Sequence, residues 1–148
     1  MSAPRGCGKN GDMDDLEPST SDLLSLENAV DGATRNALAL HLSEAKVVGV
    51  GEVLVRLIER SDLANNRGTL VHALRHYDCA PYLPLLVDLV TTAGFEVAHE
   101  ALEALQTIEH VQGSEVSAAC EKVEGALGKG NLEDWRRPLL EHLLDMFD

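Results

Sequence analysis

Two stretches of the chain, 52–77 and 83–108, resemble each other when one is shifted by about 31 residues, a repeat length typical of stacked helical hairpins. At this shift apolar residues fall on apolar residues, whereas the polar positions differ. The pairs are Leu54 with Leu85, Val55 with Leu86, Ile58 with Leu89, Ala73 with Ala104, Leu74 with Leu105 and Tyr77 with Ile108. Because stacked hairpins build an extended scaffold with a concave surface, the repeat favours binding over catalysis.

The composition also favours helices. Aromatic residues make up 3% of the 148 residues, whereas β-strands prefer aromatic and β-branched side chains. We therefore expect an all-α protein with a single helical domain over residues 21–148. Residues 1–20 are rich in Gly, Asp, Ser and Pro and lack apolar periodicity, which predicts a disordered N-terminal tail.

Apolar spacing and capping residues predict the individual helices. Ser21 or Asp22 is expected to cap the first helix, and Asn65 or Asn66 the third. The second helix begins near Ser43 or after Gly51, and the last has a kink or restart at Pro138. The expected helices end near 42, 60 and 77, and then span about 81–92, 95–109, 114–127 and 132–147.

The charge is strongly negative, with 25 acidic and 12 basic side chains and a formal net charge of −13. It is also uneven, because no Lys or Arg lies between Arg75 and Lys122. Such a charge repels phosphate backbones and anionic lipids and attracts basic proteins. We therefore expect no nucleic-acid partner and no membrane partner.

Export and membrane insertion are not predicted. Cys7, Cys79 and Cys120 are too scattered for a disulfide framework or a paired metal motif. The N-terminus lacks an apolar signal segment, and no stretch of about 18 apolar residues occurs. We expect a cytoplasmic protein.

The segments Pro81–Val90 and Phe95–Leu105 resemble the HEAT-repeat family. The resemblance rests on the Pro and Leu-Leu of the first segment, and on Glu96-Val97 and the Ala-x-x-Ala-Leu of 101–105 in the second. It implies antiparallel helix pairs stacked into a short right-handed superhelix, an α-solenoid. Such motifs define an architecture and say little about activity.

An enzymatic function is not expected. His99-Glu100 lies where deoxyhypusine hydroxylase resembles this unit, a resemblance that implies a di-iron centre built from several His-Glu pairs. The 31-residue shift places Gly68 and Thr69 opposite that pair, so the set is incomplete.

Two other histidines, His72 and His76, have the four-residue spacing seen in metal sites, with Glu103 as a conceivable third ligand, but no further ligand follows at a fixed distance. Nucleophile and phosphate-loop motifs are also missing. We expect no catalytic residue, no cofactor and no metal.

The expected partner-binding surface is a polar ridge on the second helix of each unit, which the HEAT resemblance places on the concave face. Its members are Thr69, His72, Arg75 and His76 on one unit and Glu96, His99, Glu100, Glu103 and Thr107 on the next. Carboxylates three and four residues apart repel one another, and a cationic partner relieves that repulsion. A merely solvated helix face is the alternative.

The chain also looks like the immunity proteins of bacterial toxin systems, which neutralise cationic nuclease toxins. The similarity rests on the run 65–79 together with 96–100 and on the acidic charge. It implies a non-catalytic, monomeric inhibitor of a basic protein such as a toxin domain. Candidate anchors are Trp135, Tyr82, Tyr77 and Arg75. A general HEAT adaptor for protein–protein interaction is the alternative function.

Overall fold

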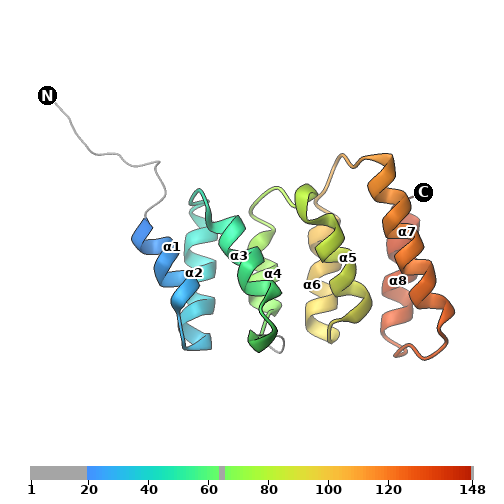
Figure 1. Cartoon of the computed structure of the whole chain (residues 1–148), viewed down its shortest axis with the longest axis horizontal. Helices are drawn as coiled ribbons and strands as arrows, with labels where there is room; N and C mark the ends of the chain where they lie inside the picture. Colours follow the sequence, from blue (N-terminus) through green and yellow to red (C-terminus); the bar gives the residue numbers. More distant parts are fainter. Residues whose placement is uncertain (1–19, 64–65, 148) are drawn as a thin grey trace, which may run out of the picture. The chain divides into compact units, whose positions relative to one another are not determined.

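The computed structural model describes residues 20–63 and 66–147, and all regular structure within these ranges is helical (Figure 1). The all-α prediction is therefore confirmed. The predicted disordered tail lies outside the described residues, except for its last residue, Thr20, which begins the first helix. The elements are α1 (Thr20–Asn28), α2 (Gly32–Glu44), α3 (Val50–Glu59), the 3-10 turn η2 (Ser61–Leu63), α4 (Gly68–Leu74), the 3-10 turn η3 (Ala80–Tyr82), α5 (Leu83–Thr92), α6 (Phe95–Leu105), α7 (Gly113–Gly128) and α8 (Arg136–Met146).

The described helices group into two compact units. Unit 1 holds α1 to α4 and ends at Tyr77, and unit 2 begins at Asp78 and holds α5 to α8. Each unit contains two consecutive helical hairpins. None of the helices in the described ranges combines the length and the apolar composition needed to cross a membrane.

In unit 1 the two hairpins pack with like helices together. Helix α1 contacts α2 within the first hairpin, and α3 contacts α4 within the second. Between the hairpins, α1 packs on α3 and α2 packs on α4, and α2 also contacts α3. The interior is aliphatic, which is why so few aromatic residues suffice; its fully buried large side chains are Leu26, Leu54, Leu57, Ile58, Leu70 and Leu74.

The prediction of a single helix over about 21–42 is wrong, because two helices, α1 and α2, occupy this stretch. Asp31 is the N-cap of α2, and its Oδ2 accepts hydrogen bonds from the backbone N of Thr34 at 3.0 Å and from the Thr34 hydroxyl at 2.9 Å. This cap starts a new helix at Gly32, although glycine has a low helix propensity. The expected caps Ser21 and Asp22 instead lie inside the first turn of α1.

The second hairpin of unit 1 follows the predicted order, but α3 begins neither near Ser43, which lies in α2, nor after Gly51, which lies in α3 itself. Helix α3 begins after Gly49, whose φ of 94° is readily adopted only by glycine, and ends one residue before Arg60. Helix α4 begins at Gly68 after Arg67, so the expected cap Asn66 is not its N-cap, and Asn65 lies outside the described residues. The helix stops at Leu74, and tighter turns continue to Tyr77.

Tyr77 closes unit 1. Its hydroxyl donates a hydrogen bond of 2.8 Å to the carbonyl oxygen of Val47, in the turn before α3. Its ring lies against Gly51, where the Cβ of an alanine would be 3.4 Å from the ring carbon Cγ, an ordinary contact distance. Burial raises the pKa of this phenol to about 12.

Unit 2 has the same internal order. Helices α5 and α6 form one hairpin and α7 and α8 the other, with α5 packed on α7 and α6 packed on α8. Within unit 2, α5 and α7 therefore form one layer and α6 and α8 the second (Figure 1). Helix α6 starts after Gly94, as expected, but ends at Leu105, four residues before the expected 109. Helix α7 starts at Gly113, one residue before the expected 114. Helix α8 begins later than expected, at Arg136, so Pro138 lies in its first turn, where no backbone N–H is needed and no restart occurs.

The 31-residue shift predicted from the sequence pairs buried residues with buried residues in the second helix of the repeat. In the first helix the predicted pairing is wrong by one residue. Ala73 and Ala104 are both fully buried, but Leu54 is fully buried while Leu85 is only half-buried. A shift of about 32 residues instead pairs Leu54 with Leu86, both of which have no exposed surface. The first helices therefore correspond at a shift of about 32 residues and the second helices at 31, so a single shift cannot fit both.

Candidate functional site

The residues of the predicted ridge fall in both units, and each group is described within its own unit. In unit 1, Thr69 and His72 lie on α4, whereas Arg75 and His76 lie in the turn that follows it. All four side chains are half-buried. The ridge of unit 1 is therefore less exposed than a solvated helix face.

A hydrogen bond fixes the orientation of the His72 ring. Nδ1 of His72 lies 2.6 Å from Nη2 of Arg75, and since a guanidinium only donates, Nδ1 accepts. Nδ1 of His72 is therefore occupied by this hydrogen bond. No group of three potential metal ligands comes together anywhere in residues 20–63 and 66–147.

In unit 2 the predicted ridge lies along the outer side of α6. Glu96, Glu103 and Thr107 are exposed and His99 and Glu100 are half-buried, whereas Val97 and Ala101 face the interior. Thr107 lies beyond the end of the helix, and its hydroxyl donates to the carbonyl oxygen of Ala104 at 2.6 Å. We call Glu96, His99, Glu100, Glu103 and Thr107 the α6 ridge.

An aromatic cluster lies at the beginning of the α6 ridge. The ring of Phe95 is 4.1 Å from that of His99 and 5.3 Å from that of Trp135, which it meets edge to face. Nδ1 of His99 donates to the Phe95 carbonyl oxygen at 2.7 Å, which holds the imidazole against the phenylalanine. Phe95 nevertheless remains 58% exposed, so part of this aromatic surface is open to solvent.

Trp135 is held in place by its neighbour Arg136. The guanidinium carbon of Arg136 lies 4.4 Å from the centre of the Trp135 ring, a cation–π geometry. Arg136 is only 4% exposed, and it donates to the carbonyl oxygens of Val90 at 2.8 Å and Ala93 at 2.6 Å, at the C-terminal end of α5. The tryptophan is thus anchored through a buried arginine to a different helix.

The charge of Arg136 is balanced by Glu133. Nε and Nη2 of the arginine donate to the two carboxylate oxygens of Glu133 at 2.8 and 3.0 Å. This pairing lowers the pKa of the Glu133 carboxyl to about 2. Because the pair is internal to unit 2, Arg136 contributes little positive charge to its surface.

Unit 2 carries most of the negative charge of the protein. Residues 78–148 contain 14 acidic and four basic side chains, a formal charge of −10. Besides Arg136, Lys122 is also paired, with its Nζ 2.9 Å from Oδ1 of Asp88. Glu96 directly follows Phe95 in the sequence and Asp134 directly precedes Trp135, and both carboxylates are exposed. The aromatic cluster is therefore bordered by negative charge.

Part of this site was missed by the sequence analysis. Trp135 was a candidate anchor, but Phe95, Arg136 and Glu133 were not. The sequence did contain an indication of Phe95. It is the first residue of a helix whose apolar stripe begins at Val97, so the phenylalanine does not belong to the buried face of that helix. Of the cysteines, Cys79 is buried and Cys120 half-buried, and Cys7 lies outside the described residues.

Comparison of the chain with protein-family models, with curated proteins and with solved structures gives no match.

Proposed function

We propose that this protein is a non-catalytic binding protein whose α6 ridge and aromatic cluster engage a basic protein. The supporting observation is the open aromatic surface of Phe95, His99 and Trp135 within a unit of formal charge −10. Aromatic residues at the centre of an interface supply much of the binding energy, and surrounding charges steer the partner and set its orientation.

The architecture that we propose for this purpose is a short HEAT-like α-solenoid. Its support is the repeated packing order within each unit, in which first helices pack on first helices and second helices on second helices. In such an architecture the second helix of each hairpin lines the concave face, and α4 in unit 1 and α6 in unit 2 are second helices. The residues that unit 1 contributes to binding in this proposal are Thr69, His72, Arg75 and His76.

The partner that suits this surface is a cationic toxin domain, which makes the protein an acidic cytoplasmic inhibitor of the immunity type. A nuclease toxin carries basic residues where it binds phosphate, and a negative surface with an aromatic centre blocks that region. The alternative of a general adaptor predicts binding without inhibition and without a preference for basic partners.

The test uses the protein encoded beside the gene for this chain. An inhibitor is expected to bind the C-terminal domain of that protein, to abolish its nuclease activity at equimolar ratio, and to lose affinity steeply as salt rises. Titration calorimetry at low and high salt measures the affinity. A neighbouring protein that is bound without loss of activity would favour the adaptor.

Two substitutions on the binding surface sharpen the test. Phe95→Ala and Glu96→Lys are expected to weaken binding by about tenfold or more each, since they remove an anchor and reverse a bordering charge. Glu124→Lys is the matched control, because Glu124 is exposed on α7, in the other layer of unit 2. Equal effects of Glu96→Lys and Glu124→Lys would show that the α6 ridge is not the site.

A further inference from the structure

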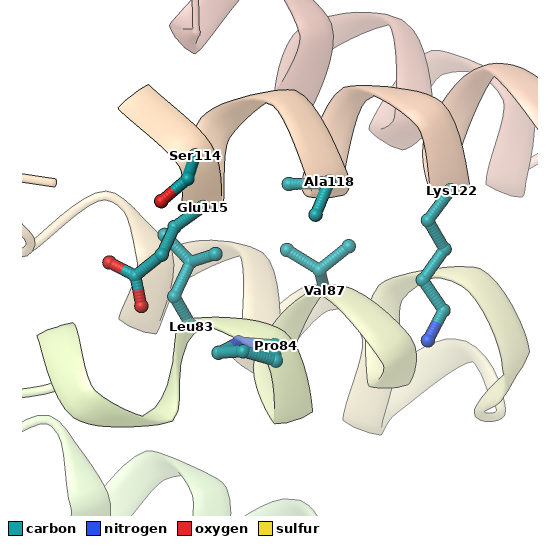
Figure 2. Close-up of a pocket in the computed structure, with 8 residues that line it drawn as sticks. Leu83, Pro84, Val87, Ser114, Glu115, Ala118 and Lys122 are labelled. Atoms are coloured by element: carbon teal, nitrogen blue, oxygen red, sulfur yellow. The ribbon is translucent and has the colours of Figure 1, made fainter. Parts of the chain in front are cut away.

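A groove runs between α5 and α7, in the layer of unit 2 that does not contain the α6 ridge (Figure 2). Its volume is about 310 Å³. Leu83 and Val87 of α5 and Ala119 of α7 form a buried floor, and the exposed Pro84 and Ala118 form an apolar rim. On α7 two of the lining residues, Ala118 and Ala119, have small side chains.

The two ends of the groove differ in charge. In Figure 2, Val87 and Ala118 face each other across the middle, Glu115 lies at one end and Lys122 at the other. The lysine is already paired with Asp88 at 2.9 Å. Within the described part of the chain, no Lys or Arg is paired with Glu115, a half-buried side chain in the first turn of α7.

We propose that this groove binds an amphipathic basic segment of a partner protein. Aliphatic side chains of the segment lie on Leu83, Val87 and Ala118, and a lysine or arginine one helical turn away meets the carboxylate of Glu115. The volume accommodates two or three aliphatic side chains rather than a whole domain. An acidic segment is disfavoured by Glu115 and by the charge of −10 on unit 2.

This inference goes beyond the proposed function, because it concerns a different face and a short segment instead of a folded toxin domain. The experiment uses the full-length protein and a synthetic, fluorescein-labelled helical peptide made of leucine and lysine, with leucines at three- and four-residue steps. Fluorescence anisotropy measures binding, and a peptide with glutamate in place of lysine measures the charge preference. The leucine–lysine peptide is expected to bind and the glutamate peptide is not.

Matched variants locate the binding. Ala118→Arg places a cation in the groove and is expected to weaken binding by about tenfold or more, whereas Ser117→Arg, on the neighbouring exposed position of α7, makes the same charge change outside the groove. Glu115→Gln is expected to weaken binding by about two- to fivefold, and Glu124→Gln on the same helix is its control. Methyl resonances of Leu83 and Val87 are expected to shift when the peptide is added.

The inference is overturned if the peptide does not bind, if the glutamate peptide binds equally well, or if the two arginine variants behave alike. Loss of binding in Phe95→Ala but not in Ala118→Arg would also overturn it, while leaving the α6 ridge as a binding surface. Failure of the neighbouring-gene test does not affect the groove, so the two proposals fail separately.

Discussion

Arg136 and Val90 are joined by a hydrogen bond of 2.8 Å between Nη1 of the arginine and the carbonyl oxygen of the valine, although 46 residues separate them in the sequence. The bond places a buried guanidinium at the C-terminal end of α5, where carbonyl groups lack partners within the helix. A positive charge at that end of a helix is also favourable to the helix dipole. The same arginine then supports the ring of Trp135.

Replacing Arg136 with methionine is expected to destabilise unit 2 by about 2–4 kcal/mol, because two buried carbonyl oxygens lose their donors and Glu133 loses its partner. Urea denaturation followed by circular dichroism measures the change. Arg137→Met is the control, since Arg137 is the next residue and is exposed. Equal stability of the two variants would contradict the role assigned to Arg136.

Glu133 makes the stability of the protein sensitive to acid. Its pKa is lowered from 4.5 to about 2 in the folded protein, so the unfolded chain binds the proton more readily. The stabilisation from the pair is present above pH 4.5 and is lost as the pH falls toward 2. Comparing the pH dependence of urea denaturation for the native sequence and Glu133→Gln tests this. The two curves are expected to converge at low pH, and parallel curves would refute the prediction.

Tyr77 is expected to ionise late. Its pKa is raised to about 12 by burial, so its phenolate absorbance is expected to appear well above the pH at which ordinary tyrosines ionise. Since the unfolded chain releases this proton near pH 10, stability falls as the pH rises above that value. Tyr77→Phe is expected to remove the late transition and to cost about 1 kcal/mol through the lost bond to Val47. Tyr82→Phe is the control and leaves the late transition in place.

The N-cap of α2 is expected to matter for unit 1. Asp31→Ala removes the acceptor of two hydrogen bonds from Thr34 and is expected to lower the midpoint of thermal unfolding. Asp31→Asn retains an oxygen acceptor and is expected to restore most of the loss. An alanine variant as stable as the native sequence would mean that α1 and α2 are separated by packing alone.

The sequence predicted the helical class and most helix ends, because the apolar spacing and the positions of Gly and Pro are local signals. The helices that begin at Phe95 and Gly113 start within one residue of the expected positions 95 and 114. The break at Asp31 was missed because apolar residues continue across it at helical spacing. A single capping aspartate outweighed that spacing.

The candidate site was less predictable, since its geometry depends on contacts between residues that are distant in sequence. Nothing near Arg136 indicates that its donors reach α5, and nothing near Phe95 indicates that Trp135 lies beside it. The predicted repeat also paired Leu54 with the wrong leucine. Leu85 and Leu86 are both apolar, and only the packing of the folded protein shows that Leu86 is the buried one. The sequence did locate the stretch between Arg75 and Lys122 that lacks basic residues and contains α6.

The hydrogen bond between Tyr77 and Val47 affects where residues can be inserted into the chain without disturbing unit 1. The final side chain of unit 1 is fastened to a turn of the same unit, so the backbone leaves that unit from a fixed point. A residue inserted between Tyr77 and Asp78 alters the connector and leaves the interior of unit 1 intact. An insertion at that peptide bond is therefore expected to leave the packing of α1 to α4 undisturbed.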